Sequence, residues 1–159
     1  MKKLILILFL LTTLISCGVS KTVQQSKKTI KGDWLVESIT YSETGTFNVN
    51  LLNDVSSTCF EGSSWNFIPN NNTGSYTIAK DQCTEGQRYF VFTIKEIDPE
   101  TGLYDFLLKP TNEKNKSEDN HGFRLQLTHL SDSSMSWEQI VSLDNKPFKI
   151  YMNFSKIVE

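Results

Sequence analysis

The chain has 159 residues, a length typical of one domain. It carries 16 Lys and Arg against 18 Asp and Glu, a formal net charge of −2, so it lacks the basic excess of nucleic-acid-binding proteins. We therefore expect no nucleic-acid partner. An apolar fraction of 38% is also too low for a polytopic membrane protein.

The first residues have the pattern of an export signal. Lys2 and Lys3 precede an unbroken apolar run at residues 4–11. This run is shorter than the roughly 20 residues that a membrane-spanning helix needs, and its length is typical of a signal peptide. The segment Leu14-Ile15-Ser16-Cys17 follows and resembles a bacterial lipobox. The resemblance implies a lipoprotein signal peptide at residues 1–16; an ordinary signal peptide with an incidental cysteine is the alternative.

The lipobox resemblance implies that the thiol of Cys17 is acylated, and several acyl chains on one residue bind a bilayer firmly. We therefore expect a lipid anchor in the cell envelope, with the membrane as a partner. An Asp directly after the acylated cysteine resembles a signal for retention in the inner membrane. This chain has Gly18 at that position, which favours the outer membrane. Residues 17–29 are polar and without period, so they predict a flexible tether, with a short extra strand as the alternative. The folded domain is expected over residues 30–159.

From residue 30 onward, apolar and polar residues alternate with the period of a β-strand. In the clearest run, Phe148, Ile150, Met152 and Phe154 share one face. Turn-forming segments separate such runs and join neighbours as antiparallel hairpins. The pattern predicts about nine strands, at roughly 31–41, 45–52, 63–68, 74–80, 87–97, 103–109, 122–130, 134–142 and 147–157. It favours an all-β, antiparallel up-and-down barrel of eight to nine strands, which leaves no exposed edge; an open β-sandwich is the alternative.

Two predicted strands depart from clean alternation, and in the first of them Trp34, Leu35 and Val36 are consecutive and apolar. In the second, Tyr89, Phe90, Val91 and Phe92 are consecutive and apolar, so the strand is apolar on both faces. This pattern favours a strand that is packed on both sides. An outer patch for a partner is the alternative.

Besides Cys17, the chain has two cysteines, Cys59 and Cys83. An even pair in an exported chain predicts a disulfide, and a loop of this length stabilises by about 3–4 kcal/mol in the chain-entropy account. Free thiols or metal ligands are the alternatives. We expect no metal site, because neither His121 nor His129 has ligand spacing to the cysteines.

The segment Gly32-Asp33-Trp34 matches the Gly-x-Trp signature of lipocalins, in which the Trp packs against the closed end of the barrel. The whole chain after the signal peptide resembles the lipocalin-like lipoproteins of Bacteroidota-type bacteria. The segments that carry this resemblance include Lys31–Trp34, Cys59, Ser64–Phe67, Gly74–Tyr76 and Cys83. It implies a lipocalin-like barrel in which the cysteine pair ties the second-strand region to the fourth–fifth connection. Lipocalins also place an Arg near the final strand to cover the Trp; the late cations here are Lys146, Lys149 and Lys156.

The predicted function is the binding of a small hydrophobic molecule, because a barrel of this size has room for its own side chains or for one small ligand. The expected ligand contacts are inward-facing apolar residues: Trp65, Phe67, Phe92, Phe106, Leu125, Trp137 and Met152. The alternative is a protein-interaction or inhibitor-type barrel in which these residues only fill the core. Neither a Gly-x-Ser-x-Gly nor a His-Glu-x-x-His motif is present, so we expect no enzyme and no cofactor.

Overall fold

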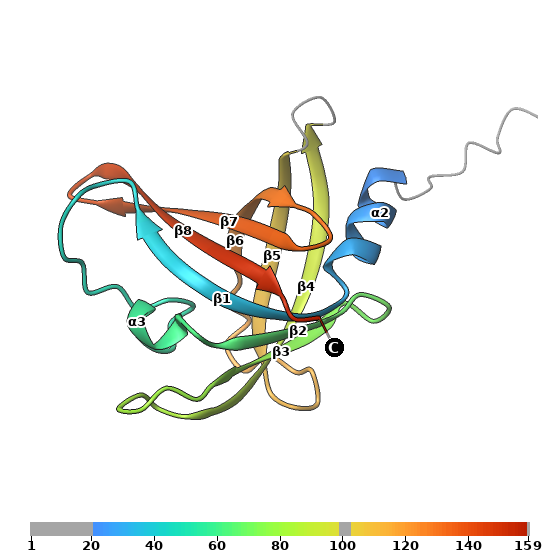
Figure 1. Ribbon diagram of the computed structural model, residues 1–159, viewed down its shortest axis with the longest axis horizontal. Coiled ribbons are helices and arrows are strands. Elements are labelled where there is room, and N and C mark those ends of the chain that lie inside the picture. The colour runs from blue at the N-terminus through green and yellow to red at the C-terminus, as the bar shows by residue number, and fades with distance from the viewer. Residues whose placement is uncertain (1–20, 99–102, 159) are drawn as a thin grey trace, which may run out of the picture.

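The computed structural model describes residues 21–98 and 103–158. Within them, eight antiparallel strands close into a barrel in chain order, which confirms the predicted fold class (Figure 1). The strands are β1 (Gly32–Tyr41), β2 (Ser64–Ile68), β3 (Thr73–Ile78), β4 (Gly86–Asp98), β5 (Leu103–Thr111), β6 (Phe123–Leu130), β7 (Ser134–Leu143) and β8 (Lys146–Lys156). The helices in this part of the chain are α2 (Lys21–Ile30) and α3 (Ser57–Phe60). The predicted signal peptide, Cys17 and the first residues of the predicted tether lie outside the described residues.

Strand β1 closes the barrel because it pairs on both of its edges. Trp34 lies opposite Trp65 of β2 on one side and opposite Lys156 of β8 on the other. Every strand is therefore hydrogen-bonded to two neighbours, and the sheet has no free edge. The open sandwich is excluded.

The predicted strand at 45–52 is wrong. Both edges of β1 are already paired, so a further strand after β1 has no edge to join. The segment is instead a loop that packs over one end of the barrel, where Leu51 and Leu52 are 1% and 4% exposed. Leu52 and Asn53 have positive φ angles, 53° and 55°, which turn the chain back toward α3.

The predicted tether is also wrong for the part that the structure describes, because residues 21–30 form α2. Val23, Ser26 and Ile30 recur with helical spacing and are the buried residues of this helix. α2 packs against β4 and β6 beside the end of the barrel (Figure 1). No helix among the described residues is long and apolar enough to span a membrane.

The inward-facing side chains of the strands form one core. The predicted face of β8 is confirmed, since Phe148, Ile150, Met152 and Phe154 are at most 3% exposed. The core also contains three tryptophans, each at most 1% exposed. Large aromatic side chains give a small barrel much buried area, which suits a chain of modest apolar content.

Candidate functional site

The structure brings the predicted ligand contacts together inside the barrel, where each is at most 2% exposed. They contact one another. The ring of Phe106 lies 5.2 Å from that of Phe92 and 4.8 Å from that of Trp137, and Phe67 lies within 6.1 Å of all three rings. Trp65 stands at 90° to Trp137 with centroids 5.4 Å apart. Leu125 and Met152 lie opposite Phe106 and Trp137 on neighbouring strands. These side chains therefore fill the middle of the barrel with one another, and a ligand contact for them stays a prediction.

One polar atom within this core is unusual. The indole Nε1 of Trp137 is buried, and no hydrogen-bond acceptor for it lies among the described residues. Its ring neighbours include Phe154 at 4.6 Å and Trp65 at 5.4 Å. A buried N–H without an acceptor is costly, and an aromatic face satisfies it only in part.

One end of the barrel is closed by the expected Gly-x-Trp motif. Gly32 has a φ of 106°, which favours glycine, and it leads the chain from α2 into β1. Trp34 is fully buried, and its Nε1 donates a hydrogen bond to the carbonyl of Ile30 at 2.8 Å. Lys156 lies with its Nζ 5.0 Å from the centre of the Trp34 ring and donates to the carbonyl of Thr29 at 2.7 Å. A lysine from the last strand therefore covers the tryptophan and ties α2 to the barrel.

At the opposite end of the barrel, an ion pair holds the loop that follows β1. Asp54, in the loop after β1, accepts hydrogen bonds from the hydroxyl of Tyr76 and from Nε of Arg88, each at 2.9 Å. Burial raises the pKa of the Tyr76 phenol well above its ordinary value of 10.0, and the adjacent Asp54 carboxylate raises it further. This contact holds the loop with Leu51 and Leu52 over the end of the barrel.

The predicted disulfide between Cys59 and Cys83 is confirmed, with Cα atoms 5.8 Å apart. It joins α3, just before β2, to the connection between β3 and β4. The resemblance implied the connection between the fourth and fifth predicted strands. That connection is the same one, now between β3 and β4, because the expected strand at 45–52 does not exist. No group of three or more potential metal ligands occurs among the described residues.

A groove of about 700 Å³ lies over β4, β5 and β6, and we call it the β4–β6 groove. Two rows of neighbouring residues form its base. Thr93 lies opposite Leu107, which lies opposite Arg124; Val91 lies opposite Lys109 in the next row. Alternation along each strand turns these side chains outward, and Leu107 is 39% exposed.

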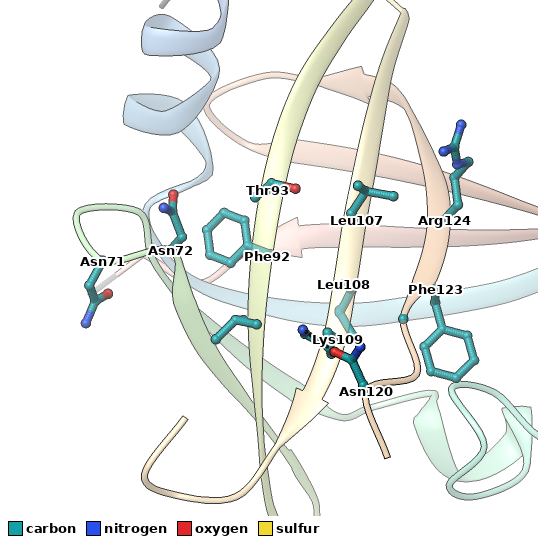
Figure 2. Close-up of a pocket in the computed structure, with 12 residues that line it drawn as sticks. Asn71, Asn72, Phe92, Thr93, Leu107, Leu108, Lys109, Asn120, Phe123 and Arg124 are labelled. Carbon is teal, nitrogen blue, oxygen red and sulfur yellow. Dashed lines mark hydrogen bonds between the residues drawn. The ribbon is translucent and has the colours of Figure 1, made fainter. Parts of the chain in front are cut away.

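Other residues complete the groove at both sides. Asn71 and Asn72 line it from the turn between β2 and β3, and Asn120 lines it from the connection between β5 and β6. Figure 2 shows the ring of Phe92 pointing from β4 toward Asn72. Phe123 lines the groove as well. The groove thus combines apolar side chains with amides and two cationic groups, and small-molecule sites likewise combine apolar walls with a few polar groups.

The groove was not predicted from the sequence, although one of its residues belongs to the expected ligand contacts. That residue is Phe92. The signal for the groove was the run of apolar residues 89–92, because Val91, on the outward face, belongs to the groove base. The strand is therefore not simply packed on both sides.

Comparisons with known proteins support the fold alone. No family model and no curated protein matches the sequence. Among solved structures, the chain is similar to a lipocalin-like protein from Bacteroides uniformis ATCC 8492, with a TM-score of 0.50 and 11% sequence identity. The match covers 81% of this chain and 99% of that chain. The likeness agrees with the Gly-x-Trp closure, and this chain has a lipocalin-like fold.

Proposed function

We propose that this protein is a lipid-anchored binding protein of the bacterial cell envelope, and that it takes up one small apolar molecule in the β4–β6 groove. Its role is binding rather than catalysis, and it uses no cofactor. The lipocalin-like fold supports a binding role in general terms. The location of the site rests on the groove itself.

The observation that carries this proposal is the size and lining of the groove. Small-molecule sites have volumes of roughly 300–1,000 Å³ and mostly apolar walls with a few polar groups. The groove has about 700 Å³, with Val91, Phe92, Leu107 and Phe123 among its apolar residues. The middle of the barrel, by contrast, is occupied by rings in mutual contact. The groove therefore offers space that the barrel axis does not.

A fluorescence titration with the neutral apolar probe N-phenyl-1-naphthylamine tests the site. We expect saturable binding to one site, and a loss of affinity of about tenfold or more in Leu107→Lys, because the new ammonium replaces an apolar contact surface for the probe. Ile140→Lys is the matched control, since Ile140 is 49% exposed on β7 and does not line the groove. Both positions are exposed, so both variants should fold. Unchanged binding by Leu107→Lys would contradict the groove as the site.

The envelope location and the lipid anchor are part of the same proposal. The lipobox-like Leu14–Cys17 segment supports it, and so does the disulfide between Cys59 and Cys83, because disulfides persist in oxidising compartments. In a bacterial host, metabolic labelling with an alkyne fatty acid should mark the wild-type protein and not Cys17→Ser. Membrane fractions should hold the label in the outer membrane. Equal labelling of both proteins would contradict the anchor at Cys17.

A second candidate is a protein-interaction barrel with a filled core. The mutual ring contacts of Phe67, Phe92, Phe106 and Trp137 favour it, because they leave the barrel axis to the protein's own side chains. This candidate predicts no saturable uptake of apolar probes by the wild-type protein. The same titration therefore separates the two candidates.

A further inference from the structure

We propose that the ligand of the β4–β6 groove is an amphipathic anion, a single apolar chain with a carboxylate head that the Lys109 ammonium binds. This inference rests on the proposed function and adds the chemical class of the ligand. The apolar residues of the groove take the chain. The Lys109 ammonium takes the head.

The charges of the groove differ in sign from the charge of the whole chain. Of the described residues that line it, Lys109 and Arg124 are cationic and none is acidic. The chain as a whole carries a formal charge of −2. A groove whose charged side chains are all positive, on a protein with net negative charge, favours an anionic ligand over a neutral or cationic one.

The two cations are not equivalent. The guanidinium of Arg124 forms an ion pair with Asp105 at 3.0 Å, and this carboxylate largely offsets its charge. Lys109 forms no ion pair with any residue that the structure describes; its Nζ donates a hydrogen bond to the side-chain oxygen of Asn120 at 2.9 Å. Since an ammonium has three donors, two remain for a ligand. Lys109 is therefore the group that a carboxylate would meet.

Gly122 and Asn120 line the groove at the end where Lys109 lies. Gly122 lies next to Lys109, and a Cβ placed on this glycine would lie 4.0 Å from the Cβ of Lys109. Asn120 stands at the same end, and its side-chain oxygen accepts the hydrogen bond from Lys109. A carboxylate bound here would accept hydrogen bonds from the Lys109 ammonium, the charge-assisted type that is strongest among hydrogen bonds.

The apolar chain of the ligand has a path away from this head site. Val91 lies directly opposite Lys109, and Leu107 lies two residues from it on the same strand. From there the groove continues to Phe92 (Figure 2). Apolar contact along this path contributes about 0.8 kcal/mol for each CH₂ that is fully buried, so most of the affinity comes from the chain and the head sets the preference.

The test is displacement of N-phenyl-1-naphthylamine by dodecanoate and by dodecan-1-ol, at monomeric concentrations and about pH 8, where the acid is ionised. These two ligands share a chain and differ at the head. We expect dodecanoate to bind the wild-type protein about fivefold more tightly, and this preference to shrink at about 0.5 M salt. Lys109→Gln should bring the ratio of the two affinities close to one. Lys114→Gln is the matched control, because Lys114 is exposed, lies just after β5 in the connection to β6 and does not line the groove.

The outcomes separate this inference from the proposed function. A preference for dodecanoate that Lys109→Gln abolishes and Lys114→Gln retains supports the inference. Equal affinities of acid and alcohol for the wild-type protein would overturn it and leave the apolar site intact, and so would a preference that survives in Lys109→Gln. Failure of the probe itself to bind would overturn the proposed function.

Discussion

Gly74 in β3 is the position at which the smallest substitution should have the largest effect on stability. It lies opposite Phe67 of β2 and Phe90 of β4. A Cβ at Gly74 would lie 2.4 Å from Cζ of Phe90 and 2.6 Å from the backbone oxygen of Asn66. Carbon atoms pack at about 3.5–4.0 Å, so Gly74→Ala requires the ring to move by about 1 Å.

The Phe90 ring has no free space into which to move. It is fully buried, with Trp65 and Phe67 rings at 5.4 and 5.5 Å. Overpacking of a core costs about 1–3 kcal/mol, and the fixed backbone oxygen on the other side places Gly74→Ala near the upper end. We therefore expect a loss of about 3 kcal/mol in unfolding free energy and a fall in Tm of about 10 °C.

Urea denaturation followed by tryptophan fluorescence measures this loss. Gly122→Ala is the matched control, because its Cβ would meet nothing closer than 3.6 Å, and it should stay within about 0.5 kcal/mol of wild type. Adding Phe90→Leu to Gly74→Ala should recover part of the loss, since the double variant no longer has the clashing ring. A Gly74→Ala protein within about 1 kcal/mol of wild type would refute the reasoning.

Three further predictions concern the ends of the barrel. In urea denaturation, the double variant Cys59→Ser/Cys83→Ser should have an unfolding free energy lower by about 3–4 kcal/mol. Reductant should have the same effect on the wild-type protein and none on the variant. An unchanged urea midpoint in the variant would contradict a stabilising disulfide. Lys156→Met should cost about 1–2 kcal/mol and speed hydrogen exchange of the α2 amides, and equal exchange would argue against the tie to α2. The pKa of Tyr76 is raised on folding. The stabilisation that its neutral phenol gives the folded state is therefore complete below the unfolded pKa of 10.0 and declines at higher pH. Unfolding free energy should therefore fall more steeply above about pH 10 in wild type than in Tyr76→Phe, and parallel curves would count against the raised pKa.

Local alternation predicted most of the barrel strands, because the apolar residues of each inward face recur at every second position within that strand's own segment. Phe148 to Phe154 is the clearest case. The segment 45–52 alternates as well, yet it is a loop, because strand pairing depends on free edges and β1 has none. The helix α2 was missed because three buried positions among ten residues are a weak helical signal in a polar segment. Gly74 was predicted as the start of the strand at 74–80, and nothing in the sequence indicated that its role is to leave space for Phe90.

The candidate site depends on information that no single strand contains. Val91, Lys109 and Gly122 become neighbours only through the registers of β4 with β5 and of β5 with β6. These registers are set by pairing between segments far apart in the sequence. The apolar run at 89–92 indicated an unusual strand, but not which residues would lie beside Val91.

The pairing of β1 with β8 also constrains how the chain folds. The contact of Trp34 with Lys156 joins the first strand to the last, so the ring cannot close before nearly the whole chain is present. Contacts between such distant segments slow folding, because the cost of closing a long loop comes before the contacts that offset it. A chain that leaves a translocation channel from its N-terminus would stay open until Lys146–Lys156 emerges. Slow closure of this kind is compatible with the export proposed above, because passage through a narrow channel requires an unfolded chain.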